Sequence, residues 1–150
     1  MDLKVITHAR PTMFLFFNRI YVTSEYLTVT SDACLESAIW HEYGHKEQFK
    51  FMFCITLISM VIFLQLVLML SSLGFLVLPF FYLLVCWFCR LGEYHSDVFS
   101  LKHTTLEGVL EMLQGEGSRL DTRLSMLFYP LRWHPCSSRR INNIFKTVKQ

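Results

Sequence analysis

The chain has 150 residues, of which 53% are hydrophobic, and its formal net charge is +2. This composition is too apolar for an ordinary soluble domain of this size, so it predicts one membrane-anchored domain over residues 1–150 that contacts the lipid bilayer. The small net charge indicates no nucleic-acid partner. The five cysteines are odd in number, and we expect them to be reduced.

Short runs of aromatic and β-branched residues fill the first part of the chain. They cover residues 11–18, 20–23 and 26–29, and their length favours two or three strands over a helix. An exposed edge strand needs a partner, so we expect residues 12–17 to pair with an extended polypeptide substrate. The alternative is a sheet that only covers the next helix. The expected substrate-binding residues are Thr12, Met13, Phe14, Leu15 and Phe16.

A candidate metal site follows within a helix predicted over residues 32–50. His41 and His45 are four positions apart, so they project from one helical face and can hold one Zn²⁺ ion. Glu42 follows the first ligand, where it can act as a general base on water activated by the metal. Because so short a motif also arises by chance, a third ligand must come from elsewhere in the chain.

Two apolar runs come next and predict a transmembrane hairpin over about residues 51–89. The first run, residues 51–70, contains Gln65 as its one strongly polar residue. Twenty residues in a helix span about 30 Å, which is the thickness of the bilayer hydrocarbon. The second run is long enough to cross the bilayer if it is counted from Leu73 to Cys89.

Basic residues flank the open ends of this hairpin, whereas its loop carries no charge. They are Lys46, Lys50, Arg90 and Lys102. The positive-inside rule then places both ends, and the metal helix with them, on the cytoplasmic side. The sequence therefore predicts an integral protein of an inner or plasma membrane whose catalytic part faces the cytoplasm.

The missing ligand is expected directly after the hairpin. Glu93 and Asp97 are four positions apart on one helical face, and the hairpin would return them to the histidines. We predict Glu93 as the third zinc ligand. Asp97 would accept a hydrogen bond from the second ring nitrogen of a ligand histidine and so orient it. The alternative is a solvated acidic pair at the membrane surface, and His95 and His103 are expected to take no part.

The remaining sequence predicts helices that serve packing. One or two amphipathic helices are expected over residues 104–128, and a turn over residues 129–135. Ser137 or Ser138 can cap a final basic helix. That helix is either solvated or lies on the membrane surface.

The order of these motifs resembles the HtpX-like and CAAX-prenyl-protease-like family of membrane zinc metalloproteases. The likeness rests on the strand region, His-Glu-x-x-His at 41–45, Glu-x-x-x-Asp at 93–97, and His134-Pro135 with Arg140 downstream. The resemblance implies an α+β, mostly α fold with a minimal zincin-like core of gluzincin type. It also implies one zinc ion per chain and cleavage of membrane-associated or unfolded polypeptides.

The same resemblance assigns roles to residues. It implies that His41, His45 and Glu93 bind zinc and that Glu42 is the general base. It suggests that His134 or Arg140 lies near the cleft and helps to bind substrate or to stabilise the oxyanion.

The sequence departs from the family in three residues and in the arrangement of its transmembrane helices. Cys136, Ser138 and Arg139 replace its usual residues, and family members carry transmembrane helices before the strands, whereas none precedes them in this sequence. Three alternatives therefore stay open. A second copy or a membrane partner completes the enzyme; the chain is a non-cleaving, zinc-bound membrane regulator or sensor; or it is a small structural membrane protein with a coincidental motif.

Overall fold

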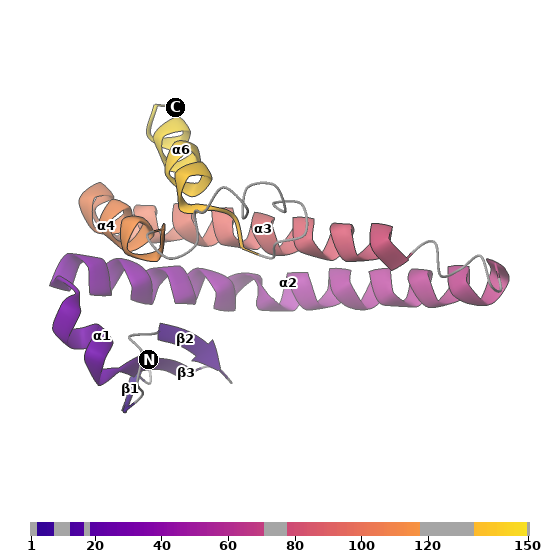
Figure 1. Cartoon of the computed structure of the whole chain (residues 1–150), viewed down its shortest axis with the longest axis horizontal. Coiled ribbons are helices and arrows are strands. Elements are labelled where there is room, and N and C mark those ends of the chain that lie inside the picture. The colour runs from indigo at the N-terminus through magenta and orange to yellow at the C-terminus, as the bar shows by residue number, and fades with distance from the viewer. Residues whose placement is uncertain (1–2, 8–12, 17–18, 71–77, 118–133, 150) are drawn as a thin grey trace.

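The computed structural model of this chain is mostly helical and contains one small three-stranded sheet (Figure 1). It describes residues 3–7, 13–16, 19–70, 78–117 and 134–149. In chain order the elements are β1 (Leu3–Ile6), β2 (Met13–Phe16), β3 (Arg19–Thr23), α1 (Ser24–Val29), α2 (Asp32–Leu70), α3 (Leu78–His103), α4 (Leu106–Gly117) and α6 (Ser137–Val148). The predicted mixed, mostly helical class with an N-terminal sheet is confirmed.

The sheet has the strand order β1-β3-β2, with β1 parallel and β2 antiparallel to β3. Strand β2 is therefore an edge, as expected for residues 12–17, although Thr12 and position 17 lie outside the described residues. Ile20 and Val22 alternate along β3 and are both buried. The sequence did not predict strand β1. This strand is mostly exposed, so its residues lack the alternation of buried and exposed positions.

Residues 26–29 are predicted as a strand, and this prediction is wrong. They belong to helix α1, which Thr23 caps by accepting a hydrogen bond from the backbone N–H of Tyr26 at 3.2 Å. A local side-chain cap thus outweighs strand propensity in so short a segment.

Helix α2 runs without a break from the predicted metal helix into the predicted membrane segment. It starts where expected, since Ser31 Oγ accepts a hydrogen bond from the backbone N–H of Cys34 at 3.1 Å. It passes straight through the polar band at residues 46–50. The histidines and the first apolar run therefore stand on one rigid element.

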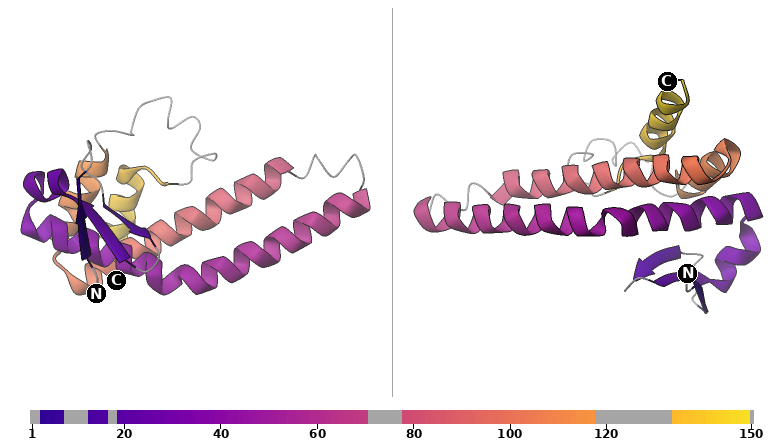
Figure 2. Two further views of the ribbon diagram at one scale, coloured as in Figure 1. Left: turned by 90° about the horizontal axis from the view of Figure 1, so that it is seen from below. Right: turned by 180° about the vertical axis from the view of Figure 1, so that it is seen from behind.

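Helices α2 and α3 lie side by side along their length and run in opposite directions (Figures 1 and 2). At one end, α4 and α6 pack onto this pair. The core formed there contains Cys34 and Ala38 of α2, Val109 and Leu113 of α4, and Ile144 of α6. The sheet packs on the same end of α2 (Figure 1). All the small elements therefore gather around the half of the helix pair that carries the candidate metal ligands.

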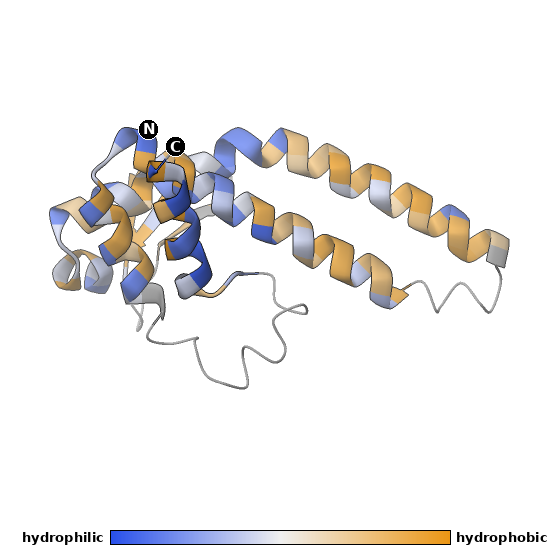
Figure 3. Cartoon of the chain, turned by 90° about the horizontal axis from the view of Figure 1, so that it is seen from above, coloured by the Kyte–Doolittle hydropathy of each residue, from blue (hydrophilic) through white to orange (hydrophobic). Residues whose placement is uncertain are grey.

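The other half of the pair is apolar and projects away from this body (Figure 3). Within the described ranges, α2 is the one helix long and apolar enough to cross a membrane, and no part of its apolar window is buried by the rest of the chain. The predicted second crossing begins at residues 73–77, which lie outside the described residues. The described part of it, at the start of α3, pairs with α2 in the expected hairpin.

Downstream, helix α4 accounts for the first part of the amphipathic region predicted over residues 104–128. Residues 118–133 lie outside the described residues, and so does most of the predicted turn. The predicted serine cap of the last helix is wrong. Cys136 holds the N-cap position of α6 and makes no side-chain capping bond, whereas Ser137 is already the first residue of the helix and is buried.

Candidate metal centre

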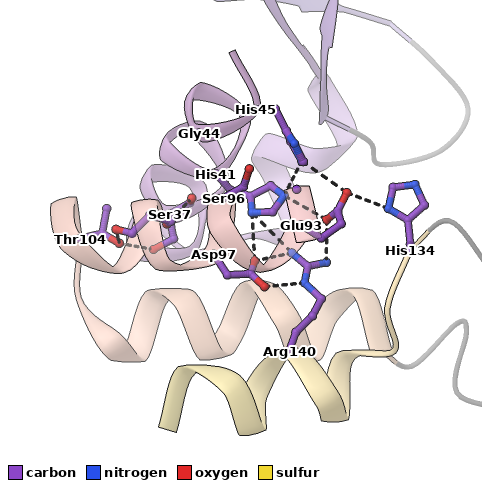
Figure 4. Close-up of polar contacts among 12 residues, drawn as sticks. Ser37, His41, Gly44, His45, Glu93, Ser96, Asp97, Thr104, His134 and Arg140 are labelled. Atoms are coloured by element: carbon purple, nitrogen blue, oxygen red, sulfur yellow. Dashed lines mark hydrogen bonds and ion pairs between the residues drawn. The ribbon is translucent and has the colours of Figure 1, made fainter. Parts of the chain in front are cut away.

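Three candidate ligands from two helices meet beside the α2–α3 contact (Figure 4). His41 and His45 lie one turn apart on α2, and Glu93 reaches them from α3. One donor atom from each lies within 4.8 Å of the others, so the group could hold a metal ion. His41 and Glu93 are buried, and His45 is half-buried, which leaves one side of the group accessible.

The spacing of these donors matches a tetrahedral ion. The Nε2 atoms of His41 and His45 are 3.1 Å apart. Glu93 Oε2 lies 3.4 Å from the first of these atoms, and Oε1 lies 3.4 Å from the second. Ligands held tetrahedrally at about 2.0–2.1 Å from one ion are about 3.4 Å from each other. The donor set of two nitrogens and one carboxylate therefore fits a small divalent cation.

A buried ion pair stands directly behind His41. Arg140 of α6 donates from Nε to Asp97 Oδ2 at 2.8 Å and from Nη2 to Oδ1 at 2.6 Å. Asp97 Oδ1 also lies 3.0 Å from His41 Nδ1, which is the contact that the sequence predicts for this carboxylate. A proton on Nδ1 leaves Nε2 of His41 directed at Glu93 and His45, so Asp97 selects the tautomer that can bind a metal.

Burial, hydrogen bonds and neighbouring charges shift the pKa values of Glu93, Asp97 and His41. Burial raises the pKa of Glu93, but hydrogen bonds with His134, His41 and His45 outweigh it and hold the pKa far below its ordinary range. In the same way, burial is outweighed at Asp97 by Arg140 and His41, so its pKa is lowered. Both carboxyl groups are therefore ionised at neutral pH.

His41 carries the compensating charge in the metal-free protein. Burial lowers its pKa, but the hydrogen bonds with Asp97 and Glu93 raise it to about 9. The two carboxylates and Arg140 leave one negative charge, and a proton on His41 neutralises it. A metal cation at the same place would replace this proton.

Two C-terminal residues that the resemblance places near the cleft do reach this group. His134 Nδ1 lies 2.9 Å from Glu93 Oε1, and its side chain is 68% exposed. Arg140 Nη1 lies 3.5 Å from Glu93 Oε2 and is buried. Both positions depend on α6, which packs against α3.

The other sequence-predicted residues lie as follows. Glu42 is half-buried on α2, next to the first ligand. His95 is exposed, and the ring of His103 stacks on Trp40 with centroids 4.2 Å apart. Neither belongs to the metal-binding group found among the described residues. β2, which holds the described part of the predicted substrate-binding strand, packs against α2, and substrate binding there stays a prediction.

Sequence reasoning missed the residues that let the two helices approach. A Cβ atom at Gly44 would lie 2.9 Å from the Cα of Ser96, so this position in the histidine motif accepts no side chain. Gln48 bridges the crossing, because its Nε2 lies 2.8–3.1 Å from Gly44 O, Gly92 O and Ser96 Oγ and shares its two hydrogens among these acceptors. Small residues on both predicted helices were the available signal.

A further polar contact extends this crossing by two turns. Ser100 Oγ donates to the backbone oxygen of Ser37 at 2.8 Å, and Ser37 Oγ lies 3.0 Å from Thr104 Oγ1. Together with the contacts of Gln48, it sets the register of α3 on α2. This register is what brings Glu93 level with His41 and His45.

No protein-family model matches the chain, and no curated protein or solved structure matches it either. The resemblance to the HtpX-like family therefore rests on the quoted motifs, and the zincin-like core stays a prediction.

Proposed function

We propose that this protein is a membrane-embedded, zinc-dependent endopeptidase that cleaves membrane-associated or unfolded polypeptides. The observation that supports it best is the convergence of Glu93 on His41 and His45, with Asp97 directly behind the first ligand. If the histidine motif were a coincidence, a carboxylate from a helix far along the sequence would not be expected to lie 3.4 Å from both imidazoles.

Zinc is the ion that best suits the donors. Two imidazole nitrogens and one carboxylate oxygen are a known ligand set of catalytic zinc, and this set keeps one position open for substrate or water. When bound, zinc supplies a Lewis acid that polarises a peptide carbonyl and activates water. One ion per chain is expected.

The residues of the chain would then divide the work. Glu42 takes the proton of the attacking water and passes it to the leaving amine. His134 or Arg140 donates a hydrogen bond to the oxyanion, and the exposed ring of His134 is the better placed to reach a substrate. The polypeptide pairs with the edge strand β2, where Phe14 and Phe16 are exposed.

The membrane part of the proposal rests on the apolar half of α2. Its hydrophobic side chains are unburied by the chain itself, so they require another apolar environment. With α2 and α3 inserted as a hairpin, the basic residues at the open end place the metal centre on the cytoplasmic face of an inner or plasma membrane.

The decisive test is cleavage of unfolded polypeptides by the purified protein in detergent or nanodiscs. Glu42→Gln should lower kcat by at least about 100-fold, because it removes the general base. Zinc content should remain one per chain in this variant. Cleavage that survives the substitution would exclude the proposed mechanism.

A second measurement tests the metal by itself. Zinc quantification on the purified protein and on Glu93→Ala should show one ion and close to none, respectively. An unchanged zinc content in Glu93→Ala would remove Glu93 from the ligand set. No zinc in the wild type, with function intact in His41→Ala, would favour the small structural membrane protein instead.

One contact favours a second candidate, a zinc-bound regulator or sensor that does not cleave. His134 Nδ1 lies 2.9 Å from the Glu93 oxygen that faces His45, so a fourth donor is at hand. Four protein ligands make a closed, structural zinc site. His134→Ala separates the two candidates: it should lower cleavage if His134 stabilises the oxyanion, and should create or raise cleavage if His134 closes the site.

A further inference from the structure

Helices α3 and α6 line an open cavity at the surface, of about 340 Å³, that the proposed chemistry does not use. Its lining residues come from one position on α3 and four on α6. They are Tyr94, Arg139, Asn142, Asn143 and Lys146. The volume lies at the lower end of the range of ligand-binding pockets, about 300–1,000 Å³.

One face of α6 packs against the protein interior, and another face lines the cavity. Arg140 and Ile144 are buried, the first at the metal centre and the second in the core. Arg139 and Lys146, together with the two asparagines, are spaced by three, four and seven positions and so share the opposite face. The face that lines the cavity is therefore separate from the face that supports the metal centre.

The chemistry of the lining suits an oxyanion. It offers a guanidinium, an ammonium, two carboxamides and a phenol, all of which can donate hydrogen bonds. Among the described lining residues none is acidic. Arginine binds phosphate through two parallel hydrogen bonds, and lysine adds a point charge.

The height of the cavity along α3 indicates where such an anion comes from. The apolar part of α3 ends at Cys89 and is followed by Arg90. Tyr94 lies four residues further, which is about 6 Å along the helix axis. The headgroup layer extends about 5–7 Å beyond each face of the hydrocarbon. In the inserted protein, the cavity is thus level with lipid phosphates.

We propose that the cavity between α3 and α6 binds the phosphate group of an anionic phospholipid. The lipid as source rests on the proposed membrane insertion, whereas the affinity for a phosphate anion does not. Because the cavity joins α6 to the helix turn that carries Glu93, a bound phosphate holds Arg140 and the metal ligands in register. Lipid binding would therefore stabilise the metal centre without touching it.

Thermal denaturation of the full chain in detergent tests the site. The additives are short-chain phosphatidylglycerol, short-chain phosphatidylcholine, inorganic phosphate, and sodium chloride at matched ionic strength. At an excess of about 100-fold over Kd, phosphatidylglycerol should raise Tm by roughly 5 °C. Phosphatidylcholine and sodium chloride should raise it much less.

Substitutions then locate the effect. Arg139→Gln and Lys146→Gln should each abolish most of the shift. Lys149→Gln removes the same charge from the same helix, but Lys149 does not line the cavity, so this variant should retain the shift. An equal loss in Lys149→Gln, or no shift with any anion in the wild type, would overturn the proposal.

The same measurements distinguish a phospholipid from a soluble phosphate as the ligand. They also distinguish failure of the phosphate site from failure of the proposed function. If inorganic phosphate shifts Tm as much as phosphatidylglycerol does, the phospholipid assignment is wrong and the ligand is a soluble phosphate. If the protein stays in solution without detergent, the membrane part of the proposed function fails, while the phosphate arm is unaffected. Absence of peptidase activity changes neither result.

Discussion

The two halves of the α2–α3 pair differ in what surrounds them. Around the metal centre, the helices pack through Gly44, Ser96 and buried charges, and other elements cover them. In the other half, α2 exposes apolar side chains: Phe53 is 58%, Ile58 60% and Leu64 56% exposed. The difference shows that the chain itself covers one half of the pair, whereas the apolar side chains of the other half are left uncovered.

The physical reason lies in where polar groups find partners. Buried charges are tolerated near α4 and α6 because Arg140 pairs with Asp97 and contacts Glu93. In the apolar half, each helix satisfies its backbone internally, so lipid can replace protein as its surroundings. The predictions below test this division, starting with the largest expected effect.

Arg140→Met should destabilise the protein most, by about 3–5 kcal/mol, because it removes one of the two buried cations that balance Glu93 and Asp97 and leaves protonated His41 as the other. Chemical denaturation of the metal-free protein in detergent measures this loss. Arg139→Met, at the exposed neighbouring position, should change stability by less than about 0.5 kcal/mol. Replacing Asp97 by Leu in the Arg140→Met background should recover part of the loss. If Arg140→Met lowered stability no more than Arg139→Met does, the buried Arg140–Asp97 pair would not stabilise the half of the molecule that carries the candidate metal ligands.

Ile58→Arg should oppose membrane insertion by about 2.5–3.5 kcal/mol, since the position is central in the apolar half of α2. The fraction of protein that resists carbonate extraction from membranes measures the effect. Val29→Arg is the control, because Val29 is 70% exposed but lies outside the apolar half. Equal, small effects of both substitutions would indicate that the apolar half is not in a bilayer.

Gly44→Ala should destabilise the protein by about 1–3 kcal/mol, because the added methyl meets the backbone of Ser96. It should also weaken zinc binding, since α3 must move and carry Glu93 away from the histidines. Gly115→Ala is the matched control on α4, where an added Cβ meets nothing within 4 Å. That substitution should stabilise the helix by up to about 1 kcal/mol. Stability and zinc affinity that survive Gly44→Ala would contradict the tight crossing.

The pH dependence of metal binding should be the mildest effect when it is counted per pH unit, at about 1.4 kcal/mol. His41 has a pKa of about 9 in the folded, metal-free protein against an ordinary value of 6.5. Its contribution to stability is therefore complete below pH 6.5 and is lost as the pH rises through about 9. Zinc must displace this proton, so affinity should rise about tenfold per pH unit and level off above pH 9.

Calorimetry in buffers of different ionisation enthalpy can count the released protons at pH 7. About one proton should leave on zinc binding, and fewer in Asp97→Asn, which lacks the charge that holds it. Glu93 and Asp97 act in the opposite direction: their pKa values are lowered, so their contribution is present above the ordinary carboxyl range and is lost as the pH falls. Zinc uptake without proton release would contradict the charge balance at His41.

The sequence by itself determined the local elements and the residue types of the candidate site. Helical spacing placed His41 beside His45 and Glu93 beside Asp97, and the length of the apolar run marked a helix that is long and apolar enough to cross a membrane. These properties depend on neighbours within a few positions. Where local signals compete, as at residues 26–29 and at the cap of α6, sequence reasoning was wrong, because one side-chain hydrogen bond or tertiary packing decides between near-equal states.

The sequence predicted that Glu93 meets His41 and His45 and that Asp97 contacts a ligand histidine, but only the tertiary structure decided how the helices pack to bring them together. The register of α3 on α2 depends on the absence of a side chain at Gly44 and on the contacts of Gln48 Nε2 with three acceptors, neither of which has a periodic signal. The same holds for Arg140, which reaches Asp97 from the last helix. Packing contacts of this kind between segments far apart in the chain depend on the fit of whole surfaces, so short patterns in the sequence report few of them.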